Sequence, residues 1–367
     1  MATVGDWISL LDSMFPPAWA EPWDNPGLQA GDRAASVDRV LIALDPAIEV
    51  ILEAKDRGAQ LIIVHHPLVF EPLSSLDLGR PVAAAVAEAL KAEIAVVACH
   101  TNADVASPGV SDALAERIGV AVGGPLVPSG AAGRSKVVTF VPIEATSAVI
   151  EAMAKAGAGV IGNYDVCSFR VRGTGTFRPG PEANPDRGEK QAVNEVEEDR
   201  VELAVPHERL AGVVDALLEA HPYEEAAYDV YELQRPPRGA VGLGRGGSLA
   251  EPVTVGDLRS RCEETLGGSA RLAGDPEAEV SAVAVCGGSG ASLIPALAGT
   301  GFDAYVTGDV KHHEALEARA AGLAVVDAGH FATEWPWVED LAARLQQDGP
   351  GDAEIALSTN RTDPWKR

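Results

Sequence analysis

Five residues of this chain combine imidazole and carboxylate chemistry, each shortly after an apolar run: His65, His66, Asp104, His330 and Glu334. In α/β proteins the carboxyl ends of parallel strands meet at one edge of the sheet, and ligands gather there. Three imidazoles and two carboxylates suit a pair of divalent transition metals such as zinc, iron or manganese. A metal pair with an open coordination position lowers the pKa of bound water and supplies hydroxide near neutral pH. The residue types therefore favour an open dinuclear centre over a closed structural zinc, which commonly uses thiolates.

Each of these motifs also has a simpler interpretation. Neighbouring side chains on an extended segment point in opposite directions, so His65 and His66 suit two different ions, but such a pair also occurs as a polar strand exit. Asp104 can bind one ion or bridge two, or it can cap a helix or close a turn. His330 and Glu334 lie four residues apart and share one face if the segment is helical, as a plain solvated pair also would. The three motifs together favour the metal interpretation.

The segments that must position these residues alternate between strands and helices. Three apolar runs in the first third predict buried strands, at residues 40–44, 61–64 and 94–98. Between them we expect one helix with Asp45 as its N-cap and Gly58 at its end, and another that begins at Pro81. Strands without polar alternation, separated by helices, indicate a mostly parallel sheet covered on both faces. The same alternation returns after Gly239 and includes a long helix over residues 332–345.

The middle of the chain has a different order of elements. Strands are expected at residues 137–141, 167–177, 201–205 and 228–233, with helices at 144–156 and 207–219. This βαββαβ order is typical of the ferredoxin-like fold. Residues 179–200 are rich in proline, glycine and charge and predict a long surface loop or hairpin. We therefore predict a discontinuous α/β domain formed by residues 1–128 and 240–367, with an inserted ferredoxin-like α+β module at residues 129–239.

Three further features carry weaker signals. His312 follows a predicted strand and is a candidate proton shuttle, although the segment could equally be a polar helix start capped by Asp309. The glycine-rich turn at residues 286–290 could hold a phosphate on its backbone amides, but tight turns use the same glycines. His221 leads into the last strand of the module, where a structural or inter-subunit role is expected rather than a catalytic one.

The composition excludes several classes of protein. Acidic residues outnumber basic ones 54 to 29 in 367 residues, which gives a formal charge of −25. A surface this negative disfavours general nucleic-acid binding and attachment to anionic membranes. No run of apolar residues is long enough to span a membrane, and the four cysteines cannot form a disulfide framework. The amino-terminal stretch lacks the basic start of a signal peptide, so we expect a cytoplasmic protein.

Five short sequence strings resemble the motifs of a known family. They are WDNPGL (23–28), IIVHHP (62–67), HTNAD (100–104), TGDVKHH (307–313) and GHFATE (329–334). They resemble the Nif-three-like dinuclear-metal-centre proteins, also called type 2 homologues of GTP cyclohydrolase I. GNYDVCSF (162–169) and HPYEEAAYD (221–229) resemble the CutA/PII-like module inserted in longer bacterial members. The resemblance implies the same five metal ligands, with Asp104 and Glu334 bridging or sharing two ions. It also implies a toroidal homohexamer.

Two functions from different classes remain open. The first is a metal-dependent hydrolase of the cyclohydrolase or phosphohydrolase type, which uses metal-activated water and acts on a purine nucleotide such as GTP. The second is a non-enzymatic metal-binding or regulatory ring whose insert binds an effector or partner. Either function is compatible with a nucleotide or other small-molecule ligand, and neither requires a membrane or nucleic acid.

Overall fold

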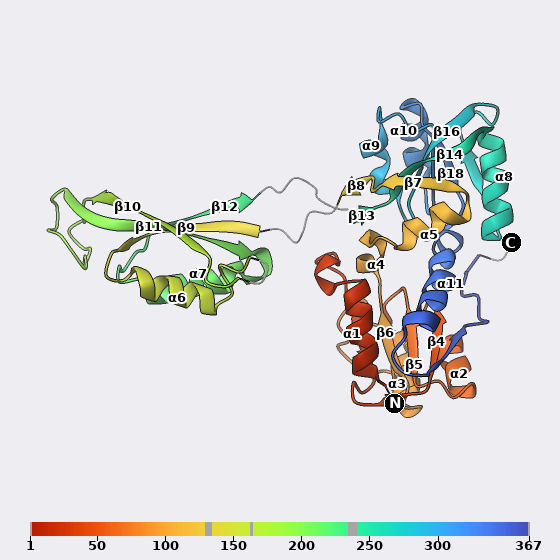
Figure 1. The fold of residues 1–367 in the computed structure, drawn as a ribbon, viewed down its shortest axis with the longest axis horizontal. Helices are drawn as coiled ribbons and strands as arrows, with labels where there is room; N and C mark the ends of the chain where they lie inside the picture. Colours follow the sequence, from red (N-terminus) through yellow and green to blue (C-terminus); the bar gives the residue numbers. More distant parts are fainter. Residues whose placement is uncertain (1, 129–133, 162–163, 234–240, 366–367) are drawn as a thin grey trace. The chain divides into compact units, whose positions relative to one another are not determined.

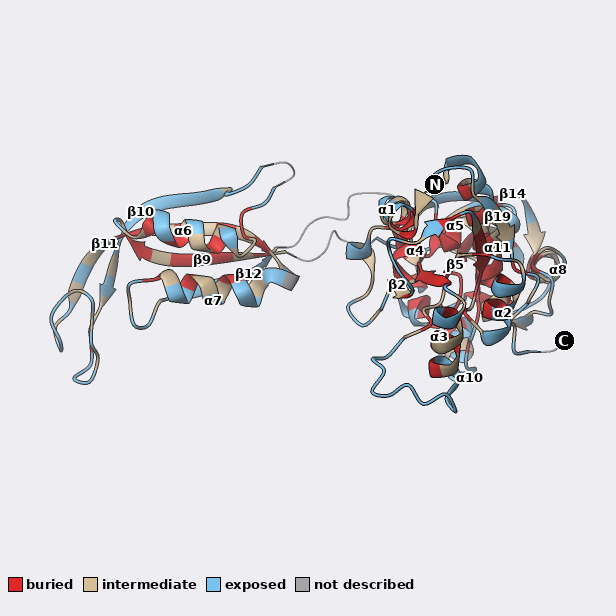
Figure 2. Ribbon diagram, turned by 90° about the horizontal axis from the view of Figure 1, so that it is seen from below, coloured by how far each residue is buried: buried red, intermediate tan, exposed pale blue. Residues whose placement is uncertain are grey.

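The computed structural model describes residues 2–128, 134–161, 164–233 and 241–365 (Figure 1). Two compact units make up the chain: residues 1–129 with 237–367 form the first unit, and residues 130–236 form the inserted unit. Both boundaries, and the first two residues of the GNYDVCSF string, fall at or within segments outside the described residues. Each unit has its own buried apolar residues, as Figure 2 shows.

A five-stranded sheet of the first unit supports the His65–His66 and HTNAD strings. Its strands lie in the order β19 (Glu354–Leu357), β4 (Arg39–Ala43), β5 (Leu61–Val64), β6 (Ala95–Ala98) and β2 (Gly27–Ala30). All neighbours are parallel except β2, which is antiparallel to β6. Every residue of β5 and β6 is buried, which explains why both appear in the sequence as uninterrupted apolar runs.

Helices cover both faces of this sheet, because alternate residues of each strand point to opposite sides. On one face Ile42, Leu61 and Ile63 join the apolar residues of α1 (Val4–Met14) and α11 (His330–Asp348). On the other, Leu41, Ile62 and Val64 join those of α2 (Ile48–Asp56) and α3 (Pro81–Lys91). The helix that begins at Pro81 is confirmed, and so is Gly58, which follows α2 with a φ of 66°.

A second sheet of six strands completes the first unit. Its order is β15 (Arg271–Ala273), β18 (Ala324–Asp327), β17 (Ala304–Thr307), β16 (Glu279–Val285), β14 (Arg245–Thr254) and β7 (Val120–Gly124). Only β16, β17 and β18 are parallel to one another. The mostly parallel sheet that the sequence predicted is the five-stranded sheet, whereas this second sheet, in which antiparallel pairings predominate, was not expected. The antiparallel strand β14 contains glycine and charge, and the apolar run of β7 stops after three residues at two glycines, so neither strand has a long apolar run in the sequence.

The remaining elements of the first unit are helices and short pairs. Helices α5 (Val110–Arg117) and α8 (Val255–Leu266) pack on one face of the second sheet, and α9 (Ile294–Leu297) and α10 (His312–Ala320) on the other. The short elements are α4 (Thr101–Val105), the 3₁₀ turns η1 (Pro17–Trp19) and η3 (Ala291–Leu293), and the strand pairs β1 (Ala2–Thr3) with β3 (Ser36–Val37) and β8 (Val127–Pro128) with β13 (Gly242–Leu243). Among the described residues, no helix is both long and apolar enough to cross a membrane.

The inserted unit has the βαββαβ order that the sequence predicted. Its elements are β9 (Arg134–Pro142), α6 (Thr146–Lys155), β10 (Ser168–Phe177), β11 (Asn194–Pro206), the 3₁₀ turn η2 (His207–Arg209), α7 (Leu210–Ala220) and β12 (Tyr228–Leu233). The sheet order β10–β11–β9–β12, antiparallel throughout, is that of a ferredoxin-like fold. Of the loop or hairpin expected at residues 179–200, the structure forms the hairpin: residues 194–200 belong to β11 and pair with β10, beyond the apolar part of the strand.

The carboxylate of Glu53 ties the segment after β19 to α2, and this contact predicts a pH effect. Burial alone would raise the pKa of Glu53, but hydrogen bonds from Ser358, Thr359 and Asn360 outweigh burial and lower that pKa to about 2. Because this pKa is depressed in the folded protein, the carboxylate stabilises the fold at pH values above its ordinary pKa of 4.5. This contribution to stability is lost as the pH falls toward 2. Glu53→Gln should therefore destabilise the protein by about 1–3 kcal/mol at pH 6.

The deficit of Glu53→Gln should shrink steadily between pH 5 and pH 2–3, because the wild-type carboxylate becomes protonated on this interval. Urea unfolding followed at pH 6, 4 and 3 measures it. The matched control is Glu49→Gln, an exposed change in the same helix, which should stay within about 0.5 kcal/mol of wild type. A deficit that does not change with pH would contradict the assignment.

Candidate metal centre

Three overlapping groups of side chains converge in the first unit. Within each group one ligand atom per residue lies within 4.8 Å of the others, and the groups are His65–His66–His100, His66–His330–Glu334 and His65–Asp104–Glu334. The structure thus brings together all five residues that the sequence singled out. His100 is an addition that the sequence analysis did not propose as a ligand. Glu334 and two histidines each belong to two groups, so the side chains form one continuous cluster.

Both sheets of the first unit contribute to this cluster. His65 and His66 directly follow β5, and Asp104 lies in α4 just after β6. His330 and Glu334 occupy the first turns of α11, which follows β18 of the second sheet, and His330 Nε2 lies 3.1 Å from Glu334 Oε1 across one helical turn. The convergence is therefore between the ends of two sheets, rather than along the single sheet edge that the strand pattern suggested.

The four histidines of the cluster share one orientation. In each ring Nδ1 lies 2.7–2.8 Å from an oxygen acceptor: the carbonyl of Cys99 for His65, and the carboxylates of Asp45, Asp24 and Asp309 for His66, His100 and His330. In a neutral imidazole whose Nδ1–H donates to such an oxygen, Nε2 carries the lone pair that can bind a metal. Outer carboxylates of this kind fix the ring and raise its basicity toward a metal. All four Nε2 atoms are thereby available to the centre.

Two of these acceptors correct the sequence prediction. Asp45 does not cap α2, whose N-cap is Ala47, and instead accepts from His66 and from Thr362. Asp309 does not cap α10, whose N-cap is Lys311, and instead accepts from His330. The sequence pattern favours local caps for both carboxylates because the histidine that each one orients lies 21 residues away in the chain.

Glu334 lies at the middle of the cluster and is only 3% exposed. Its oxygens are 3.1 Å from His330 Nε2, 3.3 Å from His66 Nε2 and 3.5 Å from His65 Nε2. Burial alone would raise the pKa of Glu334, but the surrounding histidines outweigh burial and hold that pKa well below its ordinary value. Glu334 is therefore an anion placed among imidazoles, with the ligand geometry that a cation would need.

The protonation of the histidines also reflects this anion. Burial would lower the pKa of His66, but the charge of Glu334 and the contact with Asp45 raise it to about 10. In the same way the pKa of His330 is raised to about 9. Burial raises the pKa of Asp104, which is the second carboxylate of the cluster. The raised pKa values favour protonated imidazoles at His66 and His330, and a metal cation that binds these rings would displace the protons.

Two buried atoms test whether these residues fit a metal. His65 Nε2 and Glu334 Oε2 have no hydrogen-bond partner among the residues that the structure describes, although both are inaccessible to solvent. A buried polar atom without a partner costs free energy. Nitrogen and oxygen donors aimed at one point are what a divalent transition metal requires. The residues present therefore fit one or more metal ions.

The glycine-rich turn after β16 makes room for the cluster rather than holding a phosphate. The amides of Gly287, Gly288 and Gly290 already donate to Ser111, Thr333 and Thr307. Gly288 has a φ of 67°, and a Cβ built there would lie 2.2 Å from Glu334 Oε1. Only glycine fits this conformation and this approach. The alternative of a tight turn is thus the one that the contacts support.

Two other predicted residues lie apart from the cluster. His312 is exposed in the first turn of α10, with its ring 5.3 Å from that of His313, and lines a separate hollow of about 240 Å³ with Arg271 and Lys311. It is in none of the ligand groups found among the described residues. His221 is buried in the inserted unit, where its Nε2 lies 3.0 Å from the carbonyl of Phe140, which agrees with a structural role.

An exposed pair of aromatic side chains flanks His100. Trp23 and Phe70 are 58% and 49% exposed, and their ring centroids lie 5.8 Å apart. Both rings also form T-shaped pairs with the imidazole of His100, with ring centroids 6.1 Å away for Trp23 and 6.2 Å away for Phe70. Asp24, the neighbour of Trp23, accepts from His100 and Thr101, and these bonds outweigh burial and lower its pKa to about 2. Asp24 thus fixes the segment on which Trp23 lies.

Comparison with known proteins extends these findings. The family model described as Duf34/NIF3 (NGG1p interacting factor 3) matches residues 2–364. A protein of Mycobacterium leprae named GTP cyclohydrolase 1 type 2 homolog is 42% identical, covering 99% of this chain and 95% of that protein. A Bacillus subtilis protein of the same name is 38% identical, covering 98% of this chain and 96% of that one.

Solved structures agree with this result. The structure of a Bacillus cereus protein related to NIF3 is 38% identical and matches with a TM-score of 0.67, covering 100% of this chain and 99% of that one. The Staphylococcus aureus protein SA1388 is 27% identical and matches with a TM-score of 0.69, covering 100% of this chain and 98% of that one. The likeness therefore extends over both units of the chain.

Proposed function

Because the chain belongs to the Duf34/NIF3 (NGG1p interacting factor 3) family, we propose that it holds two divalent metal ions and uses them in the hydrolysis of a small molecule. Glu334 is the observation that supports this most directly, since it is shared by two of the ligand groups. A carboxylate in that position can serve two cations at once. Zinc, iron and manganese are the metals that suit the donor set.

We assign roles to individual residues from the membership of these groups. His65 and Asp104 would hold one ion and His66 and His330 the other, and Glu334 belongs to both of these groups. Bound metal supplies hydroxide near neutral pH. His100 is placed, through Nε2, to exchange a proton with the reacting group, while Asp24 holds its ring. His312, which the sequence offered for this task, is not among these groups, so we assign the proton transfer to His100 instead.

Trp23 and Phe70 suggest the kind of substrate. Exposed aromatic rings beside a polar site bind flat heteroaromatic groups by stacking. A purine nucleotide such as GTP fits such a platform, and the name GTP cyclohydrolase 1 type 2 homolog carried by relatives points the same way. We therefore propose hydrolysis of a purine nucleotide or a related compound, with the base stacked on Trp23 and Phe70.

The direct experiment is a turnover assay on the full chain loaded separately with zinc, iron or manganese. GTP and other purine nucleotides are followed for ring opening by absorbance and for phosphate release. Turnover that disappears in His65→Ala and persists in His312→Ala supports the proposal. If no metal-loaded form converts any of these nucleotides, the proposed hydrolase function is refuted.

Removal of one ring of the Trp23–Phe70 pair gives a separate prediction. Trp23→Ala should weaken nucleotide binding about 10-fold, because a stacked ring contributes roughly 1–3 kcal/mol. Calorimetric titration with GTP on the metal-loaded protein measures this change. Tyr164→Ala, another exposed aromatic change but in the inserted unit, should leave the affinity unaltered. Equal losses in both variants would argue against stacking at Trp23.

The second candidate is a non-enzymatic metal-binding or regulatory protein, in which the insert acts as a CutA/PII-like effector module. A large cavity inside the inserted unit favours it. The homohexamer that the family resemblance implies belongs to both proposals. Light scattering with and without metal tests the hexamer. Metal-dependent assembly without turnover would favour this second function.

A further inference from the structure

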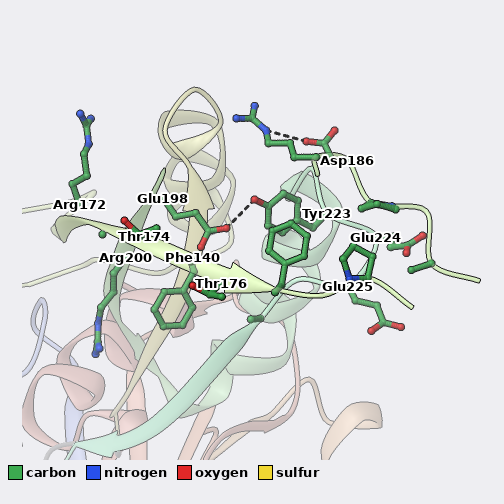
Figure 3. A pocket seen from close by; sticks show the side chains of 18 of the residues that line it. Phe140, Arg172, Thr174, Thr176, Asp186, Glu198, Arg200, Tyr223, Glu224 and Glu225 are labelled. Atoms are coloured by element: carbon green, nitrogen blue, oxygen red, sulfur yellow. Dashed lines mark hydrogen bonds and ion pairs between the residues drawn. The ribbon is translucent and has the colours of Figure 1, made fainter. Parts of the chain in front are cut away.

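The inserted unit contains a cavity of about 560 Å³ that lies far in sequence from the metal ligands (Figure 3). Its floor is the sheet face opposite α6 and α7, since Val201 and Leu203 of β11 point to those helices while Glu198 and Arg200 line the cavity. The remaining walls come from the loop after β10 and the turn before β12. A volume of this size is typical of small-molecule sites.

A single buried carboxylate faces this space. Glu198 is 8% exposed and accepts a hydrogen bond of 2.8 Å from the hydroxyl of Tyr223. Figure 3 shows this bond between Glu198 and Tyr223, and Phe140 is labelled close to the Glu198 side chain. No ion pair to Glu198 occurs among the residues that the structure describes. A buried carboxylate whose one side-chain hydrogen bond among the described residues comes from a tyrosine can still accept a hydrogen bond or counter-ion from a ligand.

Aromatic rings form much of the wall around this carboxylate. Phe140, Phe177 and Tyr223 all line the cavity, and the rings of Phe177 and Tyr223 lie 6.4 Å apart. The faces of aromatic rings carry negative charge and attract organic cations. Rings and a carboxylate in one cavity therefore select for positive charge on an apolar body.

The arginines near the cavity do not cancel this preference. Arg187 pairs with Glu144 and Asp186, Arg200 with Glu202, and Arg172 lies 3.7 Å from Asp199. In Figure 3 the guanidinium groups of Arg172 and Arg200 point away from Glu198. Each of these arginines thus has an acidic partner other than Glu198, and Glu202 pairs with Lys136 as well as with Arg200.

Two glycines keep the floor of the cavity open. Gly173 and Gly175 of β10 lie opposite Glu198 and Val196 in the sheet and line the cavity. A Cβ at Gly175 would lie 2.1 Å from Glu198 Oε2, whereas a Cβ at Gly173 would meet nothing within 4 Å. Gly175 therefore leaves space for the carboxylate, and Gly173 leaves space for a ligand.

From these contacts we infer that the inserted unit binds an organic cation, an ammonium group on an apolar or aromatic body, with Glu198 as its counter-ion. The site is independent of the proposed hydrolysis, because none of its residues belongs to the first unit. The inference thus adds a ligand to this protein whether or not the metal centre is catalytic.

Three probes that differ in charge but share a phenyl ring test the inference on the full chain. They are 2-phenylethylammonium, 2-phenylethanol and phenylacetate, and calorimetry or ligand-observed NMR measures their binding. The ammonium compound should bind at least 10-fold more tightly than the alcohol, and phenylacetate should bind least. Absence of ammonium binding, or a preference for phenylacetate, would overturn the inference.

Matched variants locate the binding. Glu198→Gln should weaken ammonium binding at least 10-fold, and Gly173→Val should abolish it by filling open space with a residue that suits a strand. Glu197→Gln removes the same charge from the other face of β11 and should leave the affinity unchanged. Circular dichroism establishes that each variant is folded. Binding that survives Gly173→Val in a folded protein would place the probe elsewhere and refute the site.

Discussion

Glu334→Gln is expected to reduce the metal affinity of this protein at least 100-fold. The substitution keeps the shape of the side chain but replaces an anion by a neutral amide, which transition metals bind poorly. Glu334 belongs to two ligand groups and contacts His65, His66 and His330, so both proposed ions lose a ligand at once. Elemental analysis after dialysis against a weak chelator, together with competition titration, measures the loss.

A control in the same helix separates this effect from general damage to α11. Glu339 pairs with Arg117 and accepts from the indole of Trp335, but belongs to none of the ligand groups among the described residues. Glu339→Gln should retain full metal content. If Glu334→Gln protein also keeps its metal after the same dialysis, Glu334 is not a ligand and the arrangement proposed for the two ions is wrong.

Arg245→Met should produce the largest loss of stability. Arg245 is 1% exposed and donates to Asp112 and to the carbonyls of Gly242, Gly244 and Ala106. Methionine removes every one of these bonds and leaves Asp112 without its buried counter-ion. Breaking a buried ion pair by removing one partner costs about 3–5 kcal/mol.

Tryptophan fluorescence during urea unfolding is the appropriate measurement, because all six tryptophans lie in the first unit, at positions 7, 19, 23, 335, 337 and 365. The signal therefore reports that unit alone. Arg117→Met, which removes a half-exposed pair with Glu339, should cost no more than about 1 kcal/mol. Similar losses in the two variants would show that the bonds of Arg245 contribute no more than a surface pair.

The five residues of the cluster that the sequence singled out were predictable because their local signals are strong. His65 and His66 follow a strand that is buried on both faces, and such strands appear as continuous apolar runs. The i, i+4 spacing of His330 and Glu334 matches the helix that contains them. The ferredoxin-like order of the insert was likewise predictable from the alternation of apolar runs.

What the sequence could not reveal depends on contacts between distant segments. The acceptor of His100 is Asp24, 76 residues earlier, so nothing in the HTNAD string marks that ring as oriented. The second sheet depends on β14 and β7, whose apolar residues are interrupted by glycines and, in β14, by charged residues. In the same way Gly288 resembles any turn glycine until its approach to Glu334 is known. Local patterns determine elements, whereas pairing decides which elements meet.

The short pair of β8 and β13 has a consequence for the history of this chain. Val127 and Pro128 lie opposite Leu243 and Gly242, so the polypeptide leaves the first unit and re-enters it at adjacent positions. A gene segment coding for a whole extra module can be gained or lost between such positions without changing the connectivity of either neighbouring sheet. Removal of the inserted unit at this pair should therefore leave the two sheets of the first unit with their connections intact.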